Sequence, residues 1–266
     1  MGNQIAISGE RLTSKETTAA GETIAAITDN IETIIVGKRQ MVELVVLTLI
    51  SGGHVLIEDV PGVGKTSLVS SLALSISCGF KRIQFTPDIM PSDLTGFSIY
   101  NQKTGEFEFR PGAVMSNIIL ADEINRASAK TQASLLEAMQ EKQVTVDSQT
   151  YLLQEPFMVL ATQNPVESFG TYPLPEAQID RFMIKISIGY PAFEDEMKVI
   201  AKSKQNKNLK SVVGEADIIA LKELAERVYV SPAMIRYIVE LVAATRNHPD
   251  ILLGSSPRGG IALHGL

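Results

Sequence analysis

Residues 55–67 read Val55-Leu56-Ile57-Glu58-Asp59-Val60-Pro61-Gly62-Val63-Gly64-Lys65-Thr66-Ser67. An apolar run leads into a glycine-rich turn, and the apolar segment 68–76 follows it. A phosphate-binding loop (P-loop) requires this order of strand, loop and helix, because small residues let backbone amides surround the phosphates at a helix N-terminus. We predict that Lys65 bridges the β- and γ-phosphates of a nucleotide and that the Thr66 hydroxyl faces Mg²⁺.

The P-loop pattern departs from its strict form at one position. Glycine is expected six residues before the lysine, and this chain has Asp59 there. A Gly-Lys-Thr tripeptide alone also occurs in ordinary strand-to-helix turns, but here the surrounding strand, helix and downstream carboxylates favour a P-loop. The residues predicted to bind the nucleotide are Pro61, Gly62, Val63, Gly64, Lys65, Thr66 and Ser67.

Polar residues follow two further apolar runs. Asp122 and Glu123 come directly after the run 117–121, and Asn164 follows the run 157–162. Parallel strands deliver such residues to one edge of a sheet, so these side chains are expected to converge on the P-loop. We predict that Asp122 holds Mg²⁺ with Thr66, that Glu123 deprotonates the attacking water, and that Asn164 contacts the water and the γ-phosphate. The alternative for Asp122 and Glu123 is a solvated strand end.

The order of the elements predicts an α/β fold with a central parallel sheet. Up to residue 188 the sequence alternates between the two kinds of element. Helices are expected at 17–35, 39–50, 68–76, 128–140 and 176–182, strands at 82–85, 117–121, 157–162 and 183–188, and hairpins at 97–109 and 143–153. After residue 190 the pattern is helical only, at 194–203, 217–228 and 231–246. We therefore predict an αβα core over residues 1–190, with 1–16 as a flexible tail, and a small helical domain over 191–266.

Composition limits the classes of function. The 266 residues are 45% hydrophobic and 20% charged, which is typical of a soluble globular protein. The net charge of −6 provides no basic surface for nucleic acid, so DNA as the main ligand is disfavoured. The single cysteine, Cys78, excludes a disulfide framework and suits a cytoplasmic location. The most apolar stretch, 41–57, is interrupted by polar residues and is not expected to span a membrane; His54 within it is interpreted as packed.

Four motifs together resemble those of MoxR-type AAA+ ATPases, in the clade with extra insertions in the ATPase core. They are residues 58–66 (EDVPGVGKT), 120–126 (LADEINR), 161–165 (ATQNP) and 173–182 (PLPEAQIDRF). The resemblance covers about residues 20–265. It implies an AAA+ core followed by a helical lid, with ATP and Mg²⁺ as cofactors.

The resemblance also assigns roles to individual residues. Asn164 matches sensor 1, Arg181 the arginine finger given to a neighbouring subunit, and Arg258 sensor 2, while Val36 and Gly37 match the adenine-side segment. The hairpins 97–109 and 143–153 match the insertions of the clade. For Arg181 the alternative is a structural salt bridge with Asp180 or Glu176, and for Arg258 an exposed loop arginine. Because the sequence stops eight residues after Arg258 and has Gly259-Gly260 where a helix is expected, the lid is expected to be truncated.

The function implied by the resemblance is ATP hydrolysis in a ring, a hexamer, that remodels or matures client proteins or inserts metal cofactors through a von Willebrand A-domain partner. One alternative is a chelatase or DNA-motor subunit of the same clade. Another is a nucleotide-dependent binding switch such as a GTPase. The switch needs an Asn/Thr-Lys-x-Asp motif, and the nearest candidate, Asn206-Lys207-Asn208-Leu209, lacks the aspartate.

Overall fold

A five-stranded parallel sheet forms the centre of the protein in this computed structural model, which describes residues 12–60, 62–164, 171–202 and 209–266. The sheet has the order β2-β5-β8-β1-β9, and every neighbouring pair is parallel. Its strands are β1 (Val55–Glu58), β2 (Phe80–Gln84), β5 (Ile118–Asp122), β8 (Met158–Gln163) and β9 (Ile184–Ile186). The predicted α/β class with a central parallel sheet is confirmed.

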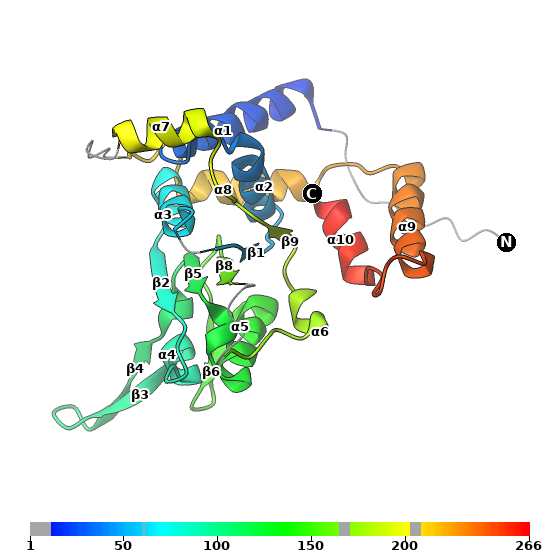
Figure 1. Cartoon of the computed structure of the whole chain (residues 1–266). Helices are drawn as coiled ribbons and strands as arrows, with labels where there is room; N and C mark the ends of the chain where they lie inside the picture. Colours follow the sequence, from blue (N-terminus) through cyan, green and yellow to red (C-terminus); the bar gives the residue numbers. More distant parts are fainter. Residues whose placement is uncertain (1–11, 61, 165–170, 203–208) are drawn as a thin grey trace.

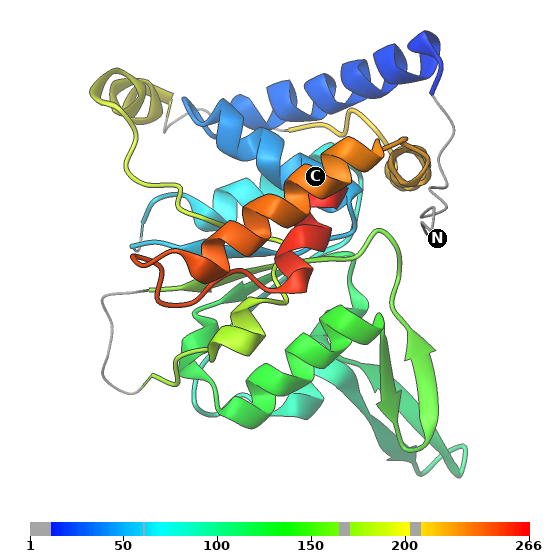
Figure 2. The ribbon, with the colours of Figure 1, turned by 90° about the vertical axis from the view of Figure 1, so that its right-hand side faces the viewer.

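Alternation along the strands divides the core into two layers. On β5, Ile118 and Leu120 face one cluster of buried side chains, while Ile119 and Ala121 face the other. Successive strand residues point to opposite faces of a sheet, so apolar side chains on both faces require helices on both faces. Figures 1 and 2 show this three-layer arrangement.

One face of the sheet is covered by the N-terminal helices and the P-loop helix. These are α1 (Ser14–Glu32), α2 (Arg39–Ile50) and α3 (Lys65–Ser75), and α8 (Glu215–Glu226) packs on α2 from further along the chain (Figure 1). Ile218 and Leu221 of α8 are buried in the same cluster as Val45 of α2. The second helix of the region 191–266, predicted to form a separate helical domain, therefore contributes to the core around the sheet.

The other face carries α4 (Pro91–Thr95) and α5 (Ala129–Glu141), together with two antiparallel hairpins (Figure 1). The hairpins are β3 (Gly96–Asn101) with β4 (Glu106–Pro111), and β6 (Gln143–Val146) with β7 (Gln149–Leu152). Phe109 stacks on Tyr151 with a centroid distance of 3.9 Å, so the two hairpins support each other. Short 3₁₀ turns, η1 (Ala113–Met115) and η2 (Ile124–Arg126), connect these elements to the sheet.

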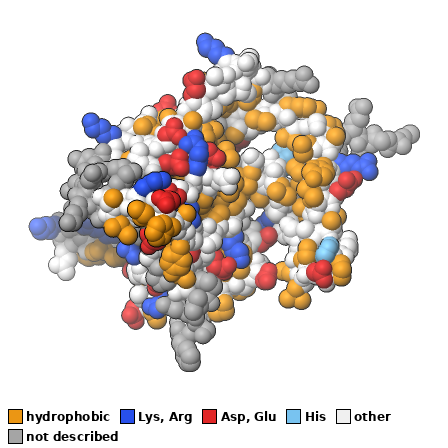
Figure 3. All heavy atoms as spheres, turned by 45° about the horizontal axis from the view of Figure 1, so that its top comes forward, with side chains coloured by type: hydrophobic (Ala, Val, Ile, Leu, Met, Phe, Trp, Pro, Cys, Tyr) orange, Lys and Arg blue, Asp and Glu red, His pale blue; other side chains and the backbone are white. Residues whose placement is uncertain are grey.

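The remaining helices are α6 (Glu176–Ile179), α7 (Phe193–Lys202), α9 (Pro232–Asn247) and α10 (Pro257–Gly265). Helices α9 and α10 lie side by side in Figure 2 and enclose a groove of about 410 Å³. Figure 3 shows hydrophobic side chains exposed on this part of the molecule, at the right of the view. The exposed hydrophobic residues of α9 and α10 include Met234, Tyr237, Val239, Leu241, Ile261 and Leu263.

Two expectations differ from the structure. Residues 14–16, predicted to belong to the tail, are helical because Thr13 and Glu16 form a capping box at the start of α1. Residues 257–265 are helical although Gly259 and Gly260 disfavour a helix; the Ser256 cap and Pro257 in the first turn define the helix start. Among the described helices, none has the length and apolar character needed to cross a membrane.

Candidate active site

The P-loop occupies the carboxyl end of β1 and leads directly into α3. Gly62 has φ of +88° and Gly64 has φ of +92°, so a side chain at either position would strain the backbone. No side chain caps the N-terminus of α3, and its first turn contains no acidic residue. The amides of this turn are therefore suited to receive an anion. Of the predicted loop residues, Pro61 lies outside the described part of the chain.

Lys65 and Thr66 open α3, where both side chains are half-buried. The Lys65 ammonium donates a hydrogen bond to the carbonyl oxygen of Asp59 at 3.1 Å, which keeps the lysine folded back over the loop. A lysine in this position carries its charge next to the helix N-terminus, so both can act on the same bound anion.

Asp122 and Glu123 end β5 and are held by one threonine of the neighbouring strand. The Thr162 hydroxyl donates to Asp122 Oδ1 at 2.6 Å and accepts the amide of Glu123 at 2.8 Å. Glu123 has left-handed backbone angles, φ 57° and ψ 50°, and Thr162 is fully buried. This hydroxyl thus holds the Asp122 carboxylate and the backbone of Glu123.

Strand β2 supplies further partners for the two carboxylates. Arg82 donates to Asp122 Oδ2 at 2.7 Å, and Gln84 donates to Glu123 Oε2 at 2.9 Å. Arg126 forms a second contact with Glu123 Oε2 at 3.2 Å. Thr162, Arg82 and Gln84 were not predicted from the sequence as site residues. The register of the parallel strands, which pairs Gln84 with Asp122, is the feature that places β2 beside the site.

Asn164 and the Val36-Gly37 segment lie close to the same edge. Asn164 follows β8, which is flanked by β1 and β5, and only 7% of its surface is exposed. Ile35, just before the segment, approaches the loop so closely that a Cβ on Gly64 would lie 3.9 Å from its Cδ1. The structure therefore brings the P-loop, Asp122, Glu123, Asn164 and the predicted adenine-side segment to one region.

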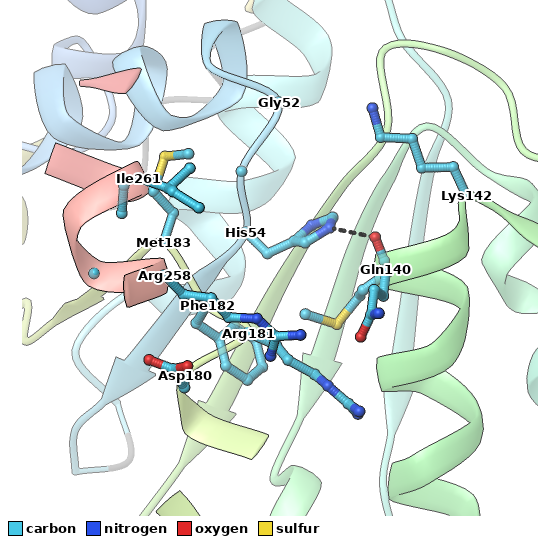
Figure 4. A pocket seen from close by; sticks show the side chains of 14 residues that line it. Gly52, His54, Gln140, Lys142, Asp180, Arg181, Phe182, Met183, Arg258 and Ile261 are labelled. Carbon is cyan, nitrogen blue, oxygen red and sulfur yellow. Dashed lines mark hydrogen bonds between the residues drawn. The ribbon is translucent and has the colours of Figure 1, made fainter. Parts of the chain in front are cut away.

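Arg181 and Arg258 lie elsewhere, in a pocket of about 310 Å³ that no P-loop residue lines (Figure 4). Asp180 accepts the Ser256 hydroxyl at 2.7 Å, which anchors the start of α10 next to Arg181. The Arg181 Nε is buried and lacks a hydrogen-bond partner among the described residues. The structure does not show the salt bridge considered as an alternative for Arg181, and it does not bring Arg258 to the P-loop of its own chain.

His54 lines the same pocket and is a structural residue. Its Nδ1 accepts the Val159 amide at 3.0 Å, so its Nε2 carries the proton toward the Met139 carbonyl at 3.2 Å. Burial lowers the pKa of His54 to about 4, since the charged ring would lose its hydration. The interpretation of His54 as a packed residue is confirmed.

The donor set at the sheet edge fits Mg²⁺ held jointly with a nucleotide. The described residues contain no group of three or more His, Cys, Asp or Glu side chains that could hold a metal by themselves. Mg²⁺ is commonly bound through one or two protein oxygens together with substrate phosphates, and Thr66 and Asp122 are oxygen donors of this kind. The residues present therefore fit the ion that the sequence analysis expects.

Comparisons with known proteins agree with this geometry. The family described as "ATPase family associated with various cellular activities (AAA)" matches residues 54–184, which contain the P-loop, both carboxylates and Asn164. A crystal structure of a proposed ATPase from Cytophaga hutchinsonii has a TM-score of 0.86 at 44% identity and covers 94% of this chain and 80% of that one.

Two relatives define the branch. The uncharacterized protein YeaC of Bacillus subtilis is 56% identical over 238 residues, 88% of this chain and 74% of YeaC. Chaperone MoxR1 of Mycobacterium tuberculosis is 43% identical over 243 residues, 88% of this chain and 64% of MoxR1. The chain belongs to the AAA+ ATPases, and within them to the MoxR family.

Proposed function

We propose that the protein binds ATP with Mg²⁺ at the carboxyl edge of its sheet and hydrolyses the anhydride bond between the β- and γ-phosphates, which gives ADP and phosphate. The observation that carries this proposal is the position of the uncapped α3 N-terminus at the same edge as Asp122, Glu123 and Asn164. Phosphoryl transfer requires charge neutralisation and a positioned water more than covalent chemistry. Lys65 and the amides in the first turn of α3 supply charge neutralisation, and Glu123 and Asn164 position the water.

Glu123 acts as the general base in this proposal. Its Oε2 is held by Gln84 and Arg126, so the water is deprotonated either by Oε1 or, after exchange of one of these contacts, by Oε2. Mg²⁺, held by Asp122 and Thr66, would supply charge neutralisation for the phosphates. Thr162 keeps the Asp122 carboxylate and the backbone of Glu123 in place during this step.

Arg181 acts on a nucleotide bound to a neighbouring subunit. Its pocket contains no residue of its own P-loop, and its buried Nε has no partner within the described part of the chain, which suits a guanidinium completed by another molecule. An arginine supplied in trans stabilises charge that develops in the transition state and contributes roughly 10³–10⁵ in turnover in phosphoryl-transfer systems. On the family resemblance we propose that the subunits form a ring, a hexamer, with Arg258 as a second cation in the same pocket.

The ring is proposed to remodel client proteins in a chaperone-like manner, together with a von Willebrand A-domain partner. The name of the relative MoxR1, a chaperone, supports the first part of this statement. The von Willebrand A-domain partner is proposed from the family resemblance. Preference for ATP over GTP in a hydrolysis assay separates this function from that of a GTPase switch.

A mixing experiment tests the shared site. Arg181→Ala and Lys65→Ala are each expected to be inactive, the first with ATP binding retained and the second without it. Mixed rings combine an intact P-loop with an intact arginine at some interfaces, so ATPase activity should return at concentrations that allow assembly. Inactivity in oligomers shown to be mixed would refute the trans role, because an arginine acting within its own subunit gives no complementation.

A further inference from the structure

Asp59, where the P-loop departs from its strict pattern, accepts hydrogen bonds at both carboxylate oxygens. Its Oδ2 accepts the amides of Ile188 at 2.6 Å and Gly189 at 2.8 Å, and the Ser187 hydroxyl at 3.2 Å. Its Oδ1 accepts the Val60 amide at 2.9 Å, and the residue is 6% exposed. Glycine in this position would leave the amides that follow β9 without this acceptor.

The Asp59 carboxylate is charged in this setting. Burial by itself raises its pKa, but the amides of Gly189, Val60 and Ile188 outweigh burial and hold the pKa below its ordinary value. Hydrogen bonds to an ionised acceptor are about twice as strong as those between neutral groups. The contact between the P-loop and the segment 187–190 is therefore a strong one.

Lys65 extends this contact to the proposed phosphate site. Its ammonium bonds the carbonyl of Asp59, whose carboxylate in turn bonds the amides of Ile188 and Gly189. Asp59 thus links the group expected to hold the phosphates, through its backbone carbonyl, to the segment that leaves the sheet, through its carboxylate. Gly189 has φ of +63°, which marks the point where the backbone turns toward α7.

The same segment also contacts the predicted adenine side. Lys38, next to Gly37, donates to the carbonyl oxygen of Tyr190 at 3.0 Å. In α7, Asp195 lies so close to Gly37 that a Cβ there would come within 2.1 Å of its Oδ2. The residues from 187 to 195 therefore touch both ends of the proposed nucleotide site.

We propose that Asp59 is a positioning residue that ties the P-loop to the segment 187–190, so that nucleotide binding is transmitted to this segment and to α7. The proposal rests on the proposed nucleotide site for its trigger. The tie itself consists of hydrogen bonds within the chain. A loop that moves to surround phosphates moves the Asp59 carboxylate, and the two amides move with it or lose their acceptor.

Hydrogen exchange at the amides of Ile188 and Gly189 tests the proposal, together with KM and kcat for ATP. Asp59→Gly restores the strict P-loop pattern and removes the carboxylate. We expect both amides to exchange at least about tenfold faster, as for the loss of a charge-assisted hydrogen bond. The KM should stay within about threefold while kcat falls by about tenfold or more, and added ADP should no longer alter exchange over 187–200. Asp59→Asn, which keeps one acceptor oxygen, should recover most of both losses.

Ser187→Ala is the matched control, since it removes only the 3.2 Å contact and should match the wild type. Unchanged exchange at both amides in Asp59→Gly would show that Asp59 does not hold the segment. Faster exchange of both amides with a normal kcat and a normal response to ADP would show that Asp59 has a structural role only. Loss of ADP binding would show that Asp59 is needed to bind the nucleotide. Each of these results overturns the proposal. If Asp59→Gly does not fold, Asp59→Ala, which also removes the carboxylate, decides against Ser187→Ala by the same criteria. If the wild type binds no nucleotide, the proposed function fails, while exchange without nucleotide still tests the tie.

Discussion

Replacement of Thr162 by valine removes the hydroxyl that links Asp122 and Glu123 and keeps the shape of the side chain. The 2.6 Å bond to Asp122 Oδ1 is of the charge-assisted kind, which contributes about 1.5–3 kcal/mol. The Glu123 amide, 2.8 Å from the same oxygen, would lose its acceptor at a cost of about 1–3 kcal/mol. The two hydrogen bonds share the Thr162 oxygen, and water reaches part of the site, so their contributions do not simply add. We expect the free energy of unfolding to fall by roughly 2–4 kcal/mol.

Denaturant unfolding of Thr162→Val beside Thr162→Ser measures this effect. Serine keeps the hydroxyl and loses one methyl group, so its cost should stay near about 1 kcal/mol. Turnover should fall in the valine variant by about ten- to a hundredfold, since Glu123 loses its orientation, and should be largely kept in the serine variant. Equal stability and equal turnover of the two variants would refute the assignment of Thr162 as the residue that holds the Asp122 carboxylate and the Glu123 backbone.

Two further outcomes follow from the structure. His54 has a pKa of about 4 in the folded protein, against 6.5 when unfolded, so the unfolded chain binds more protons between these two pH values. The free energy of unfolding should therefore fall by roughly 2 kcal/mol from pH 7 to pH 5. The variant His54→Gln should lose this part of the pH dependence. An unchanged pH dependence in that variant would contradict the neutral buried ring. Phe107 is 73% exposed and packs against Tyr100 at 5.3 Å, so Phe107→Ser should lower stability by no more than about 1.5 kcal/mol and leave ATP affinity intact while weakening coupling to a client. A large loss in thermal unfolding would instead assign Phe107 to the core.

The sheet was predictable because its strands are short apolar runs that end in polar residues. The runs before Asp122 and Asn164 become β5 and β8, and the run before Asp59 becomes β1. Their shared edge follows from parallel pairing alone. Both hairpins were predictable as well, because their residues alternate about polar turns.

Contacts between distant elements were not predictable from local pattern. The role of Thr162 depends on the register of β8 against β5, and that of Gln84 on the register of β2. The partners of Asp59 lie about 130 residues further along the chain, and the motif alone marks it only as a departure. The helix α10 was missed because two glycines weigh against a helix locally, whereas the Ser256 cap and the contact of Ser256 with Asp180 favour it in the folded protein.

The central claim is that Glu123 activates water at a site where Lys65 and the α3 N-terminus bind ATP. Parallel measurement of ATP affinity and turnover in Glu123→Gln, with Lys65→Ala as the control for lost binding, tests it most directly. We predict that Glu123→Gln binds ATP within about threefold of the wild type and turns it over about 10²–10⁴ times more slowly, because only the general base is lost. Turnover near the wild-type rate in Glu123→Gln, or tight ATP binding in Lys65→Ala, would contradict the account.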